Sequence, residues 1–410
     1  MNRGRMSLGL FDQILSSASN VLVVFAIARV SSVHDFGSIA FALAALTAMM
    51  TTCRGFLGTP IVLMSSRPER IHDETRHAMV AAALLGLGAG LLVAILSLLV
   101  KAPPATFVVT ISLPVVLMQD VLRYQCIGAG HPRQAIASDG LWALGSMSLL
   151  ALTWFNRDLA SGGLILSAWA VLAVVALLVI SVPQGLLPRF KGFGEWWTGS
   201  FHDRIRFGAE AAIGETSSLL VLGTATAIIG ADAAAALRGA GSALGPLNIL
   251  LSALPLIVVP ELRRRGELTS VSLWASLRKI AFAISFVAIS VGVVTLFIPD
   301  ELGQVFLGSS WYVVHPLLPI TATEYAALAW LVAATTGMRA QARSGALLRI
   351  RLVFSIGALL FGCGAAIIWG KAPAVALALA LAAGVAAVVG RAMFLHSPFD
   401  ESRPSVHYVQ

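Results

Sequence analysis

Long apolar segments alternate with short polar connections along the whole chain. Twelve such segments can be placed, at roughly 8–30, 36–63, 78–100, 105–127, 135–155, 162–182, 207–229, 233–260, 277–298, 313–335, 346–369 and 372–395. A helix of about 20 residues is long enough to cross the hydrocarbon core of a bilayer. The pattern therefore predicts an all-α, polytopic membrane protein with about twelve transmembrane helices.

The composition agrees with this prediction. Of the 410 residues, 58% are apolar and 12% are charged, whereas about 25% of the residues in a soluble globular protein are charged. The longest polar connection, around 185–206, is too short to form a soluble domain of its own. The sequence contains no nucleophile elbow and no phosphate-binding loop. We therefore expect a protein that is not an enzyme and that needs no cofactor, apart from coupling to H⁺ or Na⁺.

The basic residues predict how the chain crosses the membrane. With both termini in the cytoplasm, 22 of the 28 Lys and Arg residues fall on the cytoplasmic side, and only Lys101, Arg157 and Lys371 fall outside. Basic segments resist translocation and stay in the cytoplasm. We therefore expect a multi-pass protein of the inner or plasma membrane with both termini cytoplasmic. The net charge of +8 follows from this topology, and no basic stripe suggests nucleic acid as a partner.

The two halves of the chain resemble each other. The stretch SSVHDFGSIAFALAAL begins at Ser31 and IGADAAAALRGAGSALGPLN begins at Ile229, and their alignment pairs Asp35 with Asp232. Parallel repeats with an even number of spans share one orientation and build two bundles around a central cavity. The predicted parts are an N-terminal six-helix lobe at 1–183, a cytoplasmic amphipathic linker at 184–206, a C-terminal six-helix lobe at 207–396 and a cytoplasmic tail at 397–410.

These two stretches, with LPLIVVPEL in the eighth segment and FDQ in the first, resemble the multidrug/oligosaccharidyl-lipid/polysaccharide (MOP) exporter superfamily. Within that superfamily, the chain is most similar to the polysaccharide flippases of the Wzx type. It has fewer candidate spans than the lipid II flippases. Its second cytoplasmic loop, SSRPERIHDETRH, lacks the Gly-x-x-x-Asp-Arg-x-Gly-Arg-Arg pattern of the major facilitator transporters. The resemblance implies a MATE-like fold and a transport function.

Arginines inside apolar segments are the first candidate functional groups, because a buried charge is costly unless it faces water or a partner. Arg29, Arg54 and Arg238 lie within predicted spans, and Arg123 lies near the inner end of the fourth. Guanidinium groups bind phosphate oxygens through a planar fork, and the resembled flippases use cavity arginines for the diphosphate of their lipid-linked substrates. We therefore predict that Arg54, Arg238, Arg29 and Arg123 bind a diphosphate. The alternative for Arg238 and Arg29 is that they extend to the outer interface.

Acidic and amide side chains are the second candidate group. Asp12, Gln13 and Asn20 lie in the first apolar segment, and Glu210 lies in the seventh. A buried carboxylate beside amides and hydroxyls can couple an ion gradient to a conformational change, and drug exporters of the resembled superfamily use an acidic residue of the first span in this way. We predict that Asp12, Gln13, Asn20 and Glu210 couple transport to H⁺ or Na⁺. The alternative is that Asp12 or Glu210 neutralises Arg54.

The sequence thus predicts a flippase that moves a polyprenyl-diphosphate-linked sugar or oligosaccharide across the membrane by alternating access, for cell-surface polysaccharide synthesis. The expected partners are the lipid-linked glycan, membrane lipids, and glycosyltransferases or a polysaccharide polymerase. One alternative is an ion-coupled exporter of small cationic drugs, which the cationic arginines disfavour. Another is a scaffold for glycosyltransferases that transports nothing itself.

Overall fold

A computed structural model describes the backbone of residues 3–63, 68–99, 101–155, 160–199, 201–265, 269–341 and 343–396. Within helices, it leaves the side chains of residues 3–14, 63, 68–69, 202–203, 206–207, 210, 253, 256–257, 260–265 and 344 outside the description. The described residues form helices and their connections, with no strand among them. This confirms the all-α prediction.

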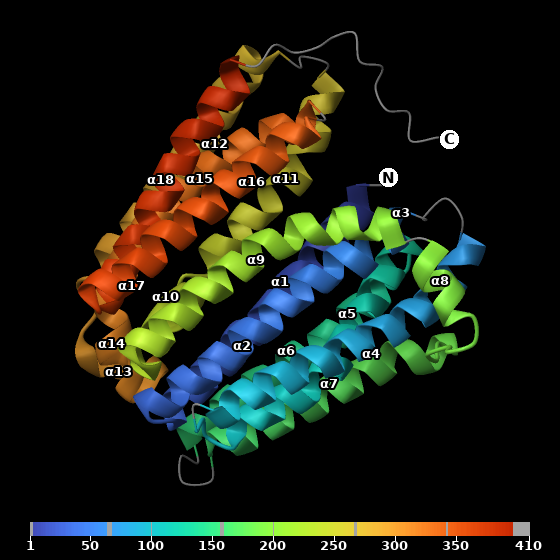
Figure 1. Cartoon of the computed structure of the whole chain (residues 1–410), viewed down its shortest axis with the longest axis horizontal. Coiled ribbons are helices and arrows are strands. Elements are labelled where there is room, and N and C mark those ends of the chain that lie inside the picture. Colours follow the sequence, from blue (N-terminus) through green and yellow to red (C-terminus); the bar gives the residue numbers. More distant parts are fainter. Residues whose placement is uncertain are drawn as a thin grey trace. The chain divides into compact units, whose positions relative to one another are not determined.

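The helices follow one another with short connections (Figure 1). In chain order they are α1 (Arg3–Val30), α2 (Val33–Cys53), η1 (Arg54–Gly58), α3 (Thr59–Leu63), α4 (Pro68–Leu99), α5 (Ala105–Gly128), α6 (Pro132–Phe155), α7 (Gly162–Gln184), α8 (Phe193–Gly199), α9 (Phe201–Ile229), α10 (Ala231–Ala243), α11 (Gly245–Arg265), α12 (Ser270–Thr295), α13 (Asp300–Leu307), η3 (Gly308–Ser310), α14 (Trp311–Val314), η4 (His315–Leu317), α15 (Leu318–Ala340), α16 (Ser344–Ala358), η5 (Leu359–Cys363), α17 (Gly364–Trp369) and α18 (Ala372–His396).

Ten helical segments among the described residues are long and apolar enough to span a membrane. They correspond to ten of the twelve predicted spans. The first predicted span corresponds to α1. The part of α1 whose side chains are described, Leu15–Val30, is a shorter apolar helix. Large apolar side chains such as Leu98, Phe282 and Val388 are exposed on the outside of these helices, as expected where lipid replaces water.

The eighth predicted span is not one continuous helix. Instead, α10 ends at Ala243 and α11 begins at Gly245, so the chain turns at Leu244. Pro246 is the physical reason, because proline has no backbone N–H to donate to the carbonyl of Ser242, one helical turn earlier. The apolar pattern runs through this break and therefore concealed it.

The described chain forms two compact units. Unit 1 contains Met1–Ser242 and Pro299–Val314, and unit 2 contains Ala243–Ile298 and His315–Gln410. Two helices of the second sequence half, α9 and α10, are thus grouped by their contacts with the first half. The two predicted lobes were defined by the internal sequence repeat, whereas the two units are defined by contacts. The lobe boundaries therefore stay a prediction.

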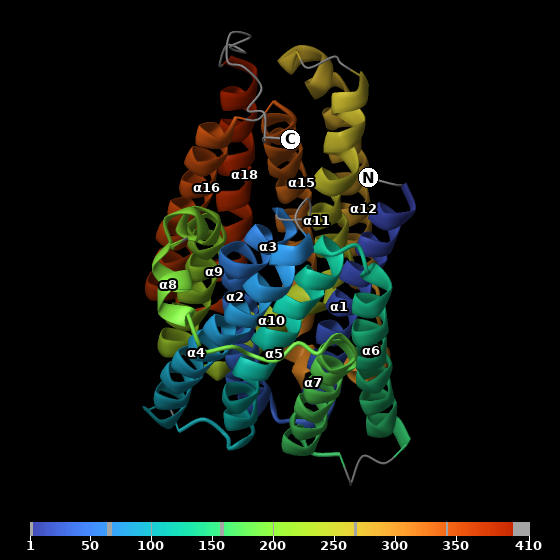
Figure 2. The same ribbon diagram turned by 90° about the vertical axis from the view of Figure 1, so that its right-hand side faces the viewer.

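Glycines bring the helices of unit 1 into close contact. In this unit α4 and α5 pack along each other, and α5 also packs against α6 and α7 (Figure 2). A Cβ atom at Gly86 would lie 2.6 Å from the Cα of Pro114, and one at Gly90 would lie 2.6 Å from the carbonyl oxygen of Thr110. Small residues four apart allow such backbone approach between membrane helices. This packing fixes the position of α5, which carries much of the candidate site.

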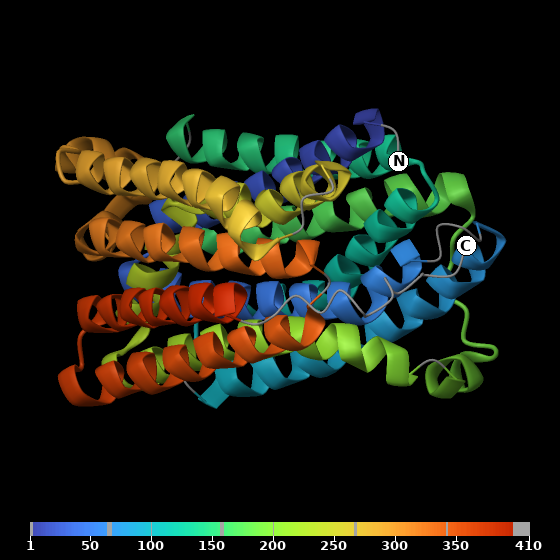
Figure 3. The same cartoon turned by 90° about the horizontal axis from the view of Figure 1, so that it is seen from above.

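Unit 2 packs around α15. Helix α15 packs against α11, α12 and α18, and α16 packs on α18. In Figure 3, α12 is gold, α15 is orange and α18 is red. Leu277, Met338 and Phe394 are buried together in the core, and a Cβ atom at Gly337 would lie 2.6 Å from the Phe394 ring. The unit thus has an apolar core of its own.

The helix begun by α2 widens into a π-helical segment, η1, before it continues as α3. The backbone N–H of Thr59 donates to the carbonyl of Arg54, five residues earlier, and the Thr59 hydroxyl donates to the same oxygen at 3.2 Å. Pro60 follows directly and cannot donate to the carbonyl of Phe56, so an α-helical pattern cannot be kept here. Arg54 therefore lies at the first residue of a locally widened helix.

Gly58 allows η1 to lie against α5. A Cβ atom at this position would come within 2.7 Å of the Tyr124 ring. We expect Gly58→Ala to push the two segments apart and to destabilise the protein by about 1–3 kcal/mol, as overpacking does. Thermal unfolding of the purified variant measures this. Gly88→Ala is the matched control, because no atom of another helix lies within 4 Å of a Cβ at Gly88; equal melting temperatures for the two variants would contradict the expectation.

Candidate functional site

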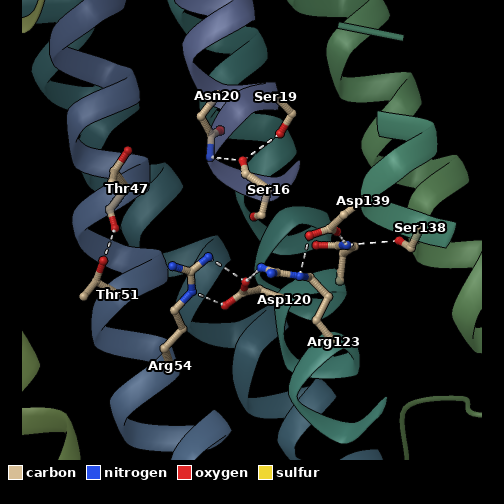
Figure 4. A network of polar contacts seen from close by, with 11 residues as sticks. Ser16, Ser19, Asn20, Thr47, Thr51, Arg54, Asp120, Arg123, Ser138 and Asp139 are labelled. Carbon is tan, nitrogen blue, oxygen red and sulfur yellow. Dashed lines mark hydrogen bonds and ion pairs between the residues drawn. The ribbon is translucent and has the colours of Figure 1, made fainter. Parts of the chain in front are cut away.

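A chain of alternating charges crosses unit 1 from η1 through α5 to α6 (Figure 4). Arg54 donates from Nε to Oδ2 of Asp120 at 2.8 Å and from Nη2 to Oδ1 at 2.9 Å. Arg123 donates from Nη1 to Oδ1 of Asp120 at 2.7 Å, and its Nε lies 2.7 Å from Oδ2 of Asp139. Two arginines and two aspartates compensate each other, so the four side chains are together formally neutral.

Burial differs along this charge chain. The side chains of Asp120, Arg123 and Asp139 are 2%, 3% and 1% exposed, whereas Arg54 is 21% exposed. Buried charges are tolerated when they are paired and hydrogen-bonded. Arg54 is therefore the most exposed of the four side chains.

Polar neighbours hold the inner end of this chain in place. Gln119 donates from Nε2 to Oδ1 of Asp139 at 2.8 Å and to the hydroxyl of Ser138 at 3.1 Å. Ser138 in turn donates to the carbonyl of Ala176 on α7 at 2.8 Å. The carboxylate of Asp139 is thus oriented by α5, α6 and α7 together. Side chains of α5 and α6 and a backbone carbonyl of α7 thus form one connected hydrogen-bond network.

A polar face on α2 leads away from Arg54. Thr47, Thr51 and Arg54 recur at helical spacing, and each threonine hydroxyl donates to the carbonyl four residues earlier, at 2.8 and 3.0 Å. Arg238 on α10 donates from Nη2 to the hydroxyl of Thr47 at 3.0 Å and is half-buried. Thr47 and Arg54 are seven residues, or about 10 Å, apart along the helix. Arg54 in η1 and Thr47 in α2 thus lie on one face of a continuous helix, and Arg238 contacts this face from α10.

The α1 side of Figure 4 is polar as well. Asn20 donates from Nδ2 to the carbonyl of Ser16 at 3.2 Å, and Ser19 donates to the same carbonyl at 2.8 Å. Asn20 is half-buried. The side chains of Asp12, Gln13 and Glu210, which the sequence predicted to couple ions, lie outside the described residues. Their roles stay predictions.

Arg29 lies apart from the other arginines, at the end of α1. It donates from Nε to the carbonyl of Thr153 at 3.4 Å, and its guanidinium carbon lies 5.6 Å from the centre of the Trp154 ring. Trp154 donates to the carbonyl of Val305 in α13 at 3.2 Å. Arg29 therefore contacts the last turn of α6, and the structure does not bring it together with Arg54.

The linker between the sequence halves is fixed to the start of α4. Trp196 in α8 donates from its indole Nε1 to Oε2 of Glu74 at 2.8 Å, and Arg204 donates from Nη2 to Oε1 at 2.6 Å. The guanidinium carbon of Arg204 lies 3.4 Å from the centre of the Trp196 ring. Burial lowers the pKa of Arg204, and the carboxylate of Glu74 opposes this effect. The predicted linker is thus held against α4 by an ion pair and a hydrogen bond to Glu74.

Among the described residues, the carboxylate that pairs with Arg54 is Asp120. The side chains of Asp12 and Glu210, the partners considered from the sequence, lie outside the described residues, so that alternative stays a prediction. Sequence reasoning did not pair Asp120 with Arg54, because 66 residues separate the two. The one available signal was the spacing of Asp120 and Arg123, which are three residues apart and therefore adjacent on a helix. Arg123 is predicted to bind a diphosphate, yet both of its described ionic partners are protein carboxylates.

The described residues hold no group of three or more His, Cys, Asp or Glu side chains arranged to bind a metal ion. The arginine, amide and hydroxyl side chains of the site can bind an anion or a polar group through hydrogen bonds. Such groups bind and release without forming covalent bonds.

No protein-family model matches the chain, and no curated protein matches its sequence. Solved structures of transporters have a similar fold. An inward-facing multidrug resistance MATE family transporter of the MOP superfamily is 14% identical, with a TM-score of 0.66 over 93% of each chain. A eukaryotic MATE transporter is 13% identical, with a TM-score of 0.63 over 97% of this chain and 96% of the other.

A MOP superfamily transporter from Pyrococcus furiosus is 14% identical, with a TM-score of 0.61 over 95% of this chain and 94% of the other. Its binding pocket is described as having a reverse polarity that suggests a different function. These likenesses confirm the predicted resemblance to the MOP superfamily at the level of fold, and the closeness to Wzx-type flippases stays a prediction. The chain therefore has the all-α, multi-pass, two-lobed fold of the MATE transporters of the MOP superfamily.

Proposed function

We propose that this protein is a flippase of the inner or plasma membrane, with both termini in the cytoplasm, that moves a polyprenyl-diphosphate-linked sugar or oligosaccharide to the outer leaflet. The supporting observation is a pair of half-buried arginines: Arg54 in η1, and Arg238 in α10, which contacts Thr47 on the same face of the helix that α2 and η1 form. Guanidinium groups bind phosphate oxygens through two parallel hydrogen bonds. Because Arg238 contacts Thr47, which lies two helical turns before Arg54, the two guanidinium groups can receive a diphosphate in succession.

The proposed path begins at Arg54. Its contacts with Asp120 use two of its five N–H groups, one on Nε and one on Nη2. The three remaining N–H groups can donate to a phosphate. Thr51 and Thr47 follow on the same helix face, and Arg238 lies at its far end. Alternating access then requires only that the anion bind the two conformations with different affinities. In this proposal Asp12, Gln13, Asn20 and Glu210 couple the cycle to H⁺ or Na⁺.

Cells that lack the protein provide the test. We expect a lipid-linked sugar intermediate to accumulate on the cytoplasmic leaflet and cell-surface polysaccharide to decrease. A membrane-impermeant glycan-modifying reagent applied to inverted and right-side-out vesicles would locate the intermediate. If no intermediate accumulates and the surface polysaccharide is unchanged, the proposal is wrong.

A second candidate function is the ion-coupled export of small cationic compounds. One observation favours it: Asp120 and Asp139 neutralise Arg54 and Arg123, which removes much of the positive charge expected to repel a cation. The likeness to multidrug resistance MATE transporters in fold is compatible with it. Efflux of ethidium that depends on Asp12, in cells with intact surface polysaccharide, would support this function over the flippase.

A further inference from the structure

We propose that Asp120 is a built-in counter-anion that limits how tightly Arg54 holds an anionic head group, so that the bound diphosphate can be released. This inference rests on the proposed function, because it concerns how the same arginine binds and releases its ligand. Asp120 acts through Arg54 and is therefore a positioning residue rather than a ligand of the substrate.

The geometry divides the Arg54 guanidinium into two edges. Asp120 occupies the side-on edge, with Nε and Nη2 at 2.8 and 2.9 Å from its two carboxylate oxygens. The end-on edge, formed by Nη1 and the second N–H of Nη2, is left for a ligand. Since Arg54 is 21% exposed and Asp120 is 2% exposed, a ligand approaches from the arginine side. The carboxylate of Asp120 thus orients the Arg54 guanidinium from the side opposite the ligand. The positive charge of the guanidinium is then divided between this carboxylate and the incoming phosphate.

Asp120 cannot move away when a ligand arrives. Its Oδ1 also accepts from Nη1 of Arg123 at 2.7 Å, and Arg123 is held in turn by Asp139. The carboxylate therefore stays a few ångströms behind the bound phosphate and repels it throughout. A binding site built only from arginines would retain a diphosphate more strongly, whereas a transporter must also let its substrate go.

Asp120→Asn isolates this effect, because it removes the negative charge and keeps a side chain of the same size. Asp139→Asn is the matched control: it removes an equally buried charge from the same network, but Asp139 contacts Arg123 and not Arg54. We would titrate the purified full-length variants in nanodiscs with inorganic pyrophosphate and with geranyl diphosphate, and measure binding by calorimetry. Loss of a charge beside the bound anion should tighten binding by Asp120→Asn on the order of tenfold or more.

The expected result is tighter binding in Asp120→Asn, an unchanged dissociation constant within about threefold in Asp139→Asn, and no binding in the double variant Arg54→Ala/Asp120→Asn. If Asp120→Asn binds no more tightly than wild type while Arg54→Ala loses binding, the counter-anion role is overturned and the anion site at Arg54 stands. If Arg54→Ala binds as wild type does, the anion site of the proposed function fails, which is a distinct outcome.

A measurement on the wild-type protein covers the case in which Asp120→Asn does not fold. The Nε–H resonance of Arg54, identified in ¹⁵N-arginine-labelled protein by its disappearance in Arg54→Lys, reports on the hydrogen bond to Asp120. We expect it to shift on addition of pyrophosphate, because the guanidinium then divides its charge between two anions. A resonance that stays unmoved at saturating pyrophosphate would overturn the inference.

Discussion

Replacing Arg54 with alanine is expected to reduce lipid-linked glycan export by about 10- to 100-fold, because charged hydrogen bonds are worth about 1.5–3 kcal/mol. Arg54 is the exposed end of the charge chain and keeps N–H groups that Asp120 does not occupy. The measurement is the rate at which surface polysaccharide appears after expression of each variant is induced in cells that lack the protein. Arg54→Lys should restore only part of the activity, since lysine keeps the charge but cannot offer a planar fork.

Two further variants separate ligand binding from charge balance. Arg70→Ala removes an exposed arginine of α4 and should leave export unchanged. Arg54→Ala/Asp120→Asn removes the ion pair as a whole and so leaves no uncompensated carboxylate. If this double variant exports normally, Arg54 served only to neutralise Asp120.

If Arg54→Ala and Arg238→Ala both leave export intact while changes in the linker abolish it, the scaffold alternative gains support.

The second large effect is expected at Arg123, but on stability rather than on ligand binding. Arg123→Ala leaves the buried carboxylate of Asp139 without its cationic partner and removes one of the two arginines from Asp120. Removing one partner of a buried ion pair costs about 3–5 kcal/mol. We expect a marked decrease in the melting temperature of the purified protein and in the amount of folded protein in the membrane.

The matched control is Arg133→Ala, an exposed arginine in the first turn of α6, which should melt as wild type does. A compensating variant sharpens the test: Arg123→Gln/Asp139→Asn removes one charge of each sign and should recover part of the lost stability. If Arg123→Ala is as stable as wild type but exports poorly, Arg123 binds the substrate, as the sequence analysis predicts, and the stability expectation is wrong.

Parts of the fold could be predicted from the sequence because they depend on local physics. A run of about 20 apolar residues must form a helix in a bilayer, since no water is available there to satisfy the backbone. This explains the agreement of the predicted spans with ten candidate membrane helices among the described residues. It also explains the error at Leu244, where hydropathy stays high across a break that Pro246 imposes on the backbone.

The candidate site shows where local reasoning ends. The sequence by itself determined that Arg54, Arg123 and Arg238 are charges in an apolar setting, each of which needs a partner or water. Only the tertiary structure decided that Asp120 pairs with both Arg54 and Arg123, that Arg238 contacts Thr47, and that Arg54 is the most exposed member of the charge chain. The reason is physical: burial and pairing depend on which helix faces meet, and that is set by contacts between residues far apart in the chain.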